Sequence, residues 1–281
     1  MTTQHDFSHS FRALANNTLM NIKLTFRDRQ AIFWIFVFPL FFLFLFATIF
    51  ARSRPEIVGS MLPGLLTINS MSSGLFGLSI TLVIARERGI LRRYRLTPIS
   101  PWMILMSRSL SSLLVGILTL SFQLVLAKLV YGITIAGGLL SLYAVLIAGA
   151  LAFIALGFII ASVADNVKIA QVMANLTFFP LMFLGGAAIP MQFLPPKLQG
   201  FAHLLPPSYM VDGLLRIMKD GQGLSPNLRN LGALLIIFVV SLLIAAKLFR
   251  WESREPLPLK QKAWAAAVIV VFLGVGLLMN P

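Results

Sequence analysis

Long apolar runs separated by short polar segments dominate the chain. Seven of them are long enough to cross the roughly 30 Å hydrocarbon core of a bilayer as helices, at about residues 31–50, 60–85, 102–127, 139–163, 168–189, 230–249 and 263–279. The runs are continuously apolar and do not alternate in period two, which disfavours a β-barrel. The pattern therefore predicts an all-α polytopic membrane protein.

The first thirty residues follow a different pattern. Apolar residues recur there at mostly three- and four-residue spacing, with basic residues between them: Phe7, Phe11, Leu14, Ile22 and Phe26. This spacing is typical of an amphipathic helix that lies in the membrane interface. An ordinary helical lead-in to the first span fits it nearly as well.

The second run, at 60–85, carries small and polar residues in its middle. Small residues four positions apart let helix backbones approach closely, so helix packing is one interpretation of this run. A polar lining for a transport path is the other. We expect five residues of this run and one asparagine of the fifth run to lie at a pathway or a subunit boundary: Asn69, Ser70, Ser73, Gly74, Gly77 and Asn175.

Composition and charge orient these spans. The chain is 58% hydrophobic and has a net charge of +14. Cytoplasmic loops of membrane proteins carry excess Lys and Arg, so the charge indicates topology and not a nucleic-acid partner. With a cytoplasmic N-terminus, the inside segments hold fifteen Lys and Arg and the outside segments hold seven. We therefore expect the N-terminus to be cytoplasmic.

Missing residue types argue against several classes of function. All nine acidic residues lie in loops or at span edges, whereas ion-coupled carriers generally need an ionisable group within the membrane. The sequence has no HExxH, GxSxG or GxxxxGK[ST] motif and no cysteine. We expect no catalytic residue, no metal and no cofactor on this chain, so a second polypeptide must hydrolyse ATP if transport is active.

Five arginines surround Glu87 in the stretch RERGILRRYRLTPIS, residues 86–100. Gly89 suits the position just after a helix, and Ser100-Pro101 suits the start of the next one. The turn is thus compact and cationic, and it fits a partner's carboxylates or anionic lipid headgroups equally well. Glu87 separates the two, because it has no basic residue three or four positions away and gains nothing from an anionic surface.

Proline pairs divide the polar segment 190–229 between the fifth and sixth runs. Pro195-Pro196 and Pro206-Pro207 predict two short helices there. By the charge argument this segment lies outside the cell. It is the longest connection between two spans.

Two blocks resemble the type-2 ABC exporter permease family: RERGILRRYRLTPISPWMILMSR from residue 86, and FLGGAAIPMQFLPPKLQGFAHLLPPSYMVDGLLRIM at 183–218. The resemblance covers about residues 10 to 250. It implies a six-span permease with an interfacial N-terminal helix and an external helical hairpin between spans five and six. In that family two copies associate in the bacterial inner membrane, and each docks on a separate ATP-binding-cassette ATPase that binds ATP and Mg.

The resemblance also assigns roles to residues. It makes the stretch 86–101 the turn that couples the permease to the ATPase, with the contributing residues Arg86, Glu87, Arg88, Gly89, Leu91, Arg92, Arg93, Tyr94, Arg95, Thr97 and Pro98. The external hairpin is marked by Pro190, Pro195, Pro206, Pro207, Tyr209 and Asp212.

The C-terminal part departs from the family pattern. We divide the chain into an interfacial segment 1–30, a six-span permease domain 31–250, and residues 251–281, a linker followed by an extra seventh span. The last run is a lipid-facing accessory helix, a contact for another subunit, or an interfacial segment that does not cross.

The expected function is outward movement of a hydrophobic or amphipathic substrate, such as a drug, a lipid or a glycan-linked lipid. The alternatives are a non-transporting scaffold or channel and, less favoured, an ion-coupled carrier.

Overall fold

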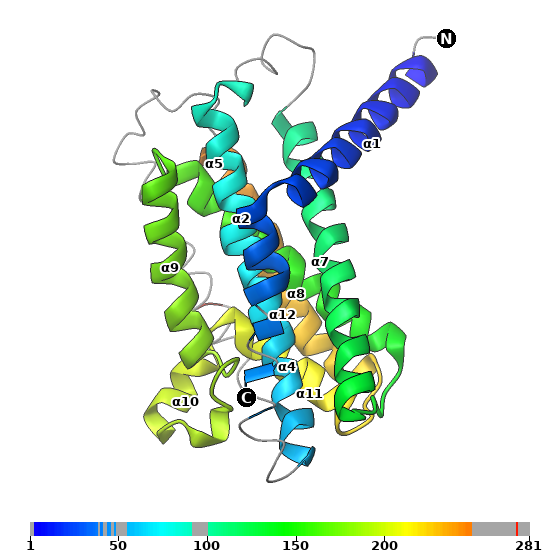
Figure 1. Ribbon diagram of the computed structural model, residues 1–281, viewed down its shortest axis with the longest axis vertical. Helices are drawn as coiled ribbons and strands as arrows, with labels where there is room; N and C mark the ends of the chain where they lie inside the picture. Colours follow the sequence, from blue (N-terminus) through cyan, green and yellow to red (C-terminus); the bar gives the residue numbers. More distant parts are fainter. Residues whose placement is uncertain are drawn as a thin grey trace.

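The computed structural model describes residues 3–38, 40–41, 44–45, 48, 55–91, 101–248 and 274, and this part of the chain contains helices and no strand. The first helix, α1 (Thr3–Arg27), runs obliquely across one end of a helix bundle (Figure 1). It packs against α7 and leaves Leu19, Met20 and Leu24 exposed. The predicted N-terminal helix is confirmed, and its exposed apolar side chains suit an interfacial position.

Five helices of the described residues are long and apolar enough to cross a membrane. They correspond to predicted spans two to six, and their helical bounds are Pro55–Glu87 (α4, η2 and α5 in succession), Pro101–Tyr131 (α7), Leu139–Val163 (α8), Val167–Leu184 (α9) and Leu228–Leu248 (α12). In the region of span one, α2 (Arg29–Ile32) and a π-helical turn η1 (Phe33–Val37) are followed by further helical residues. The seventh run lies outside the described residues, Gly274 apart.

Span five is shorter than predicted. The apolar run continues to residue 189, but α9 ends at Leu184 because the chain turns at Gly185 and Gly186. Residues 187–190 form the start of the polar hairpin instead. The predicted end at residue 189 was based on hydropathy alone, and hydropathy does not indicate where the backbone turns.

The helix α8 lies at the centre of the bundle. It packs on α12, α7 and α11 and on the continuous helix formed by α4, η2 and α5. The helices approach closely at Gly74 of η2 and Gly157 of α8, where a Cβ on Gly157 would lie only 2.9 Å from the Gly74 carbonyl carbon. Small residues thus allow backbone contact here, as the small-residue pattern of span two predicted.

Aromatic packing ties span one to this core. The fully buried Phe178 of α9 contacts the rings of Phe76 in η2 and Phe38, with ring centroids 5.2 Å and 6.1 Å apart. These edge-on contacts are the geometry that aromatic pairs prefer.

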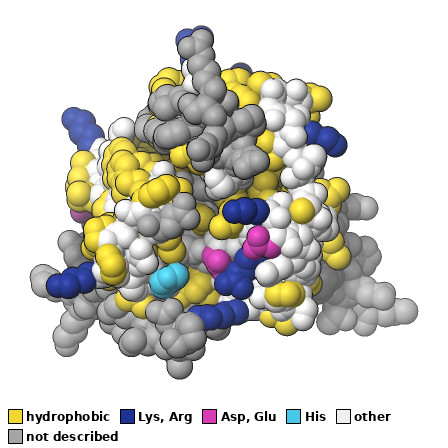
Figure 2. All heavy atoms as spheres, turned by 90° about the horizontal axis from the view of Figure 1, so that it is seen from below, with side chains coloured by type: hydrophobic (Ala, Val, Ile, Leu, Met, Phe, Trp, Pro, Cys, Tyr) yellow, Lys and Arg dark blue, Asp and Glu magenta, His cyan; other side chains and the backbone are white. Residues whose placement is uncertain are grey.

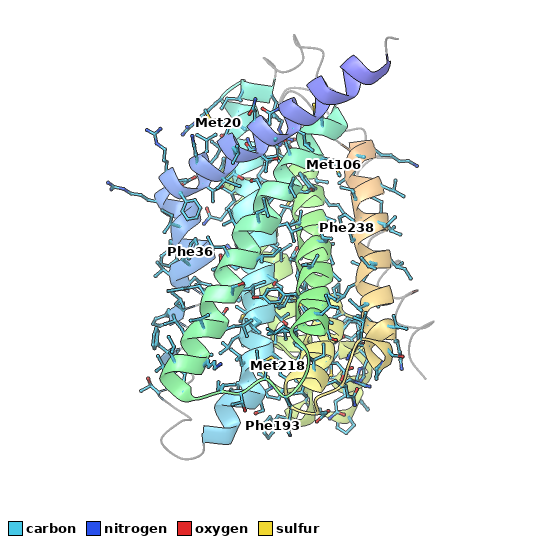
Figure 3. The ribbon with its side chains drawn as sticks, turned by 90° about the vertical axis from the view of Figure 1, so that its right-hand side faces the viewer. Met20, Phe36, Met106, Phe193, Met218 and Phe238 are labelled. Atoms are coloured by element: carbon cyan, nitrogen blue, oxygen red, sulfur yellow. The ribbon has the colours of Figure 1, made fainter. Side chains whose placement is uncertain are left out.

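The bundle has two distinct ends, and the connections fall on them alternately (Figures 1 and 3). The first, called the α1 end here, carries α1, the end of α5, the connection between α8 and α9, and the end of α12. The second, called the hairpin end, carries the start of α4, the α7–α8 connection, and the helices α10 (Pro196–Ala202) and α11 (Pro206–Met218). Met20 and Met106 lie toward the first end, and Phe193 and Met218 toward the second.

Candidate functional site

The arginine-rich turn begins where α5 ends, at the α1 end of the bundle. Gly89 follows the C-cap residue Arg88 with a φ of +68°, a conformation that side chains with a Cβ rarely adopt. The predicted helix stop at Gly89 is therefore confirmed, and α7 starts at Pro101 as predicted. Leu91 is buried, so the first residues of the turn fold back onto the bundle.

Arg86 is buried, with a relative exposure of 4%. Its guanidinium donates one hydrogen bond to the carbonyl oxygen of Ala161, at 2.8 Å, and another to that of Ala164. Both carbonyls lie at the C-terminal end of α8, where carbonyl groups lack partners within the helix and the helix dipole favours a cation. Arg86 thus fastens the end of α5 to the end of α8.

Glu87, the next residue, binds the helix on the other side of the α8–α9 connection. Its Oε1 accepts a hydrogen bond, at 3.0 Å, from the backbone N–H of Val167. Val167 is the first residue of α9. The Asn166 side chain caps the same helix by accepting from Ile169 N–H at 2.9 Å. A carboxylate is favourable at this positive end of a helix. We call the two consecutive residues, with their contacts to α8 and α9, the Arg86–Glu87 clamp.

The structure changes how Glu87 is interpreted. We expected its carboxylate to lack a partner within its own helix, and its partner does lie on another helix. That partner belongs to the same chain, however, so the carboxylate is already used within the fold. Arg88 is exposed at the α1 end. The remaining predicted coupling residues lie outside the described residues: Arg92, Arg93, Tyr94, Arg95, Thr97 and Pro98.

The predicted pathway or boundary residues do not share one exposed face. Four of them are buried inside the chain: Asn69, Ser70, Ser73 and Gly74. Gly77 and Asn175 are half-buried, on η2 and α9 respectively. Their packing is therefore between helices of one chain, and a place at a subunit boundary stays a prediction.

Asn69 has a partner that the sequence did not indicate. Its Nδ2 donates to Oε1 of Gln123 on α7, at 3.0 Å, and both side chains are fully enclosed. The outer atoms of this pair, Asn69 Oδ1 and Gln123 Nε2, have no hydrogen-bond partner among the described residues. A polar link thus joins the second and third spans in the middle of the bundle. Gln123 escaped sequence analysis because it stands alone in an apolar run.

The hairpin end contains the predicted pair of short helices. Pro195 is the N-cap of α10, and Pro206 and Pro207 are the first residues of α11. Pro190 precedes a single 3₁₀ turn, η3 (Met191–Phe193). Their ring geometry suits these starting positions. The helical division of the segment is confirmed, whereas its location outside the cell stays a prediction.

Tyr209 and Asp212 lie on α11, which packs into the bundle against α4, α8 and α12. Oδ2 of Asp212 accepts hydrogen bonds from Arg216 Nε at 2.8 Å and from Asn230 Nδ2 of α12 at 2.9 Å. Burial raises the pKa of the Tyr209 phenol, and the nearby charge of Arg229 opposes that shift. These contacts, absent from the sequence pattern, bring α11 and α12 together around charged groups.

Comparison with known proteins identifies the family of the chain. A family model described as "ABC-2 type transporter" matches residues 12–219. The chain is 22% identical over 190 residues to the "Probable multidrug ABC transporter permease YbhR" of Escherichia coli (strain K12), which covers 68% of this chain and 52% of that protein. It is 32% identical over 100 residues to Nodulation protein J of Rhizobium leguminosarum bv. viciae, which covers 36% of this chain and 38% of that protein.

The chain spans about half the length of the Escherichia coli relative, and less of the rhizobial one. The family model is the broader match. It begins within α1, includes the first four of the five described spans, and ends just after α11. It includes both the clamp and the hairpin helices. The chain therefore belongs to the ABC-2 type transporter family.

Proposed function

We propose that this chain is the membrane permease of an ATP-driven exporter, in which two copies associate and each docks on a separate ATP-binding-cassette ATPase. ATP and Mg²⁺ bind to the ATPase, and the basic turn 86–101 contacts it. The α1 end then faces the cytoplasm of a bacterium and the hairpin end faces outward across the inner membrane. Family membership and the excess of basic residues in the segments at the α1 end support this orientation.

The Arg86–Glu87 clamp carries the proposal. A force applied to the turn would reach α8 through Arg86 and α9 through Glu87, because both residues are bonded to those helices directly. The helix α8 contacts most of the bundle, so its displacement would repack the other spans. The turn could therefore transmit a displacement to the interior of the bundle. A turn that served only to keep its positive charges on the cytoplasmic side would not need these contacts.

The cargo is hydrophobic or amphipathic in this proposal. Large apolar side chains cover the exposed faces of α7, α9 and α12, and within the described spans Asp and Glu occur only as Glu56 and Glu87, at the two ends of one helix. Such an interior offers no acidic counter-ion for a free metal ion or another small cation. A drug or a lipid-like molecule is the class that fits.

Separate variants distinguish docking from transmission. The full chain is purified with its ATPase, which is identified by its Walker A loop, and both are reconstituted in proteoliposomes. Arg92→Ala with Arg93→Ala should weaken ATPase binding and make it less sensitive to salt, because salt screens the pairing that these residues are expected to make with acidic groups. Arg86→Gln should leave ATPase binding intact but lower the transport achieved per ATP hydrolysed.

Topology is tested independently on the same protein. The chain has no cysteine, so Lys219→Cys and Gln199→Cys each introduce a single thiol at the hairpin end. Both should react with an impermeant thiol reagent added to intact cells. Labelling only after the membrane is opened would reverse the proposed orientation. Copurification without any ATPase would favour a scaffold or channel instead.

A further inference from the structure

A polar pocket at the hairpin end has a composition that transport coupling does not explain. It has a volume of about 230 Å³ and is lined mainly by α11, the start of α12 and the segment between α10 and α11, with the side chains His203, Tyr209, Asp212, Arg216, Arg229 and Asn230 among its walls. Figure 2 shows basic, acidic and histidine side chains gathered around a hollow on this face. The pocket far exceeds the roughly 15 Å³ that a single water needs.

Cationic donors outnumber acidic groups in this pocket. Asp212 is its one carboxylate, and Arg216 binds it through Nε alone. A guanidinium has five N–H donors, so the terminal amino groups of Arg216 remain available; they make no hydrogen bond within the described residues. The guanidinium of Arg229 has neither an ion pair nor a hydrogen bond to another described residue. Two arginines and one aspartate therefore give the pocket one net positive charge.

Tyr209 supplies a second, independent observation. Its side chain is enclosed, with a relative exposure of 7%, and its hydroxyl has no hydrogen-bond partner among the described residues. A buried hydroxyl without a partner is costly, and native structures rarely keep one without a reason. A ligand oxygen in the pocket that Tyr209 lines would supply the missing partner after a small adjustment of the ring.

An apolar pocket adjoins the polar one. It has a volume of about 210 Å³, and Met61, Leu65, Val211 and Leu215 are among its walls, while Ser208 and Asp212 line both pockets. An apolar hollow beside a cationic one matches a molecule with an acidic head and an aliphatic tail.

We propose that the polar pocket binds a phosphate group, and that the adjoining apolar pocket takes the tail of the phospholipid that carries it. Arginine suits this ligand because its planar fork pairs with two phosphate oxygens at once. A monoanionic phosphodiester would balance the single net charge. The site does not rest on the exporter role, because its occupancy requires neither an ATPase nor transport.

Three probes identify the source of the phosphate. The full chain, purified in a neutral detergent, is titrated with dioctanoyl phosphatidylglycerol, with dioctanoylglycerol, which has the same tails and no phosphate, and with inorganic phosphate. Binding is followed by native mass spectrometry and by the shift of the thermal unfolding midpoint. We expect the phospholipid to bind most tightly and dioctanoylglycerol to bind at least about tenfold more weakly. Equal binding of phosphatidylglycerol and inorganic phosphate would assign the site to the free anion.

Two variants and a matched control locate the site. Arg229→Gln and Tyr209→Phe should each lower the affinity for phosphatidylglycerol about tenfold. Lys219→Gln removes an exposed cation from the same end but outside the pocket, and it should leave the affinity unchanged. Arg216 is left intact because its replacement would also break the pair with Asp212.

Tyr209→Phe also separates binding from folding. Because the hydroxyl has no partner in the fold, its removal should leave the unfolding temperature without ligand unchanged or slightly higher. Lower stability without ligand would show that the hydroxyl serves the fold. Equal phospholipid affinity in wild type, Arg229→Gln and Lys219→Gln, or equal binding of dioctanoylglycerol, would overturn the proposal.

Discussion

Replacing Arg86 by glutamine removes the bond between the end of α5 and the end of α8. The guanidinium donates two hydrogen bonds to α8 carbonyls, and a hydrogen bond from a charged group contributes about 1.5–3 kcal/mol. A cation at the C-terminus of a helix adds about 0.3–1 kcal/mol. Releasing a buried guanidinium recovers part of its desolvation cost. We therefore expect Arg86→Gln to lower the free energy of unfolding by about 2–4 kcal/mol.

Arg88→Gln is the matched control, because it makes the same chemical change two residues away at an exposed position. Its effect should stay within about 0.5 kcal/mol. Both variants are unfolded by denaturant in the same detergent and followed by circular dichroism. If the two variants lose equal stability, Arg86 contributes only surface charge, and the clamp has no mechanical role.

Three further changes probe the packing around the clamp and the core. Gly157→Ala would push a methyl group into the backbone of η2 and should lower the free energy of unfolding by about 1–3 kcal/mol. In the control Gly200→Ala the new methyl group meets no atom within 4 Å, so its melting temperature should stay at the wild-type value while that of Gly157→Ala falls. Gly89→Ala should lower the free energy of unfolding by about 1–2 kcal/mol, because a φ of +68° disfavours a residue with a Cβ. An unfolding temperature equal to that of the wild type would contradict this backbone conformation. Asn69→Leu should destabilise by about 1–2 kcal/mol and adding Gln123→Leu should recover part of the loss; strictly additive losses in denaturant unfolding would argue against the amide pair.

Much of the fold was predictable because the bilayer imposes its own length on a span. The bounds of α8 agree with the apolar run at 139–163, and the starts of α10 and α11 follow from their proline pairs. Gly89 was predictable for a similar reason, since glycine alone tolerates its backbone conformation easily. Each of these signals is local in sequence, so no tertiary information was needed.

The contacts at the candidate site were not predictable, because they join residues far apart in the chain. Arg86 was counted with the other basic residues of its turn, and the count of charges cannot tell a buried arginine from an exposed one. The partner of Glu87 lies 80 positions away. The pocket around Tyr209 likewise depends on how α11 meets α12. A single sequence contains no signal for such pairings.

The π-helical turn η2 (Ser73–Leu78) has a consequence for the clamp at the end of the same helix. A π turn accommodates one residue more than an α turn, so every side chain beyond it is rotated about the helix axis relative to an uninterrupted α-helix, by about 100°. Arg86 and Glu87 lie beyond η2, and the extra residue therefore sets the direction in which they point. Deleting one residue within η2 would leave the hydrophobicity and the length of the span almost unchanged while turning both charged groups away from α8 and α9. The extra residue thus fixes the rotation of the far end of the helix about its axis. A span of equal hydropathy without it would direct its terminal side chains elsewhere and could not replace this one.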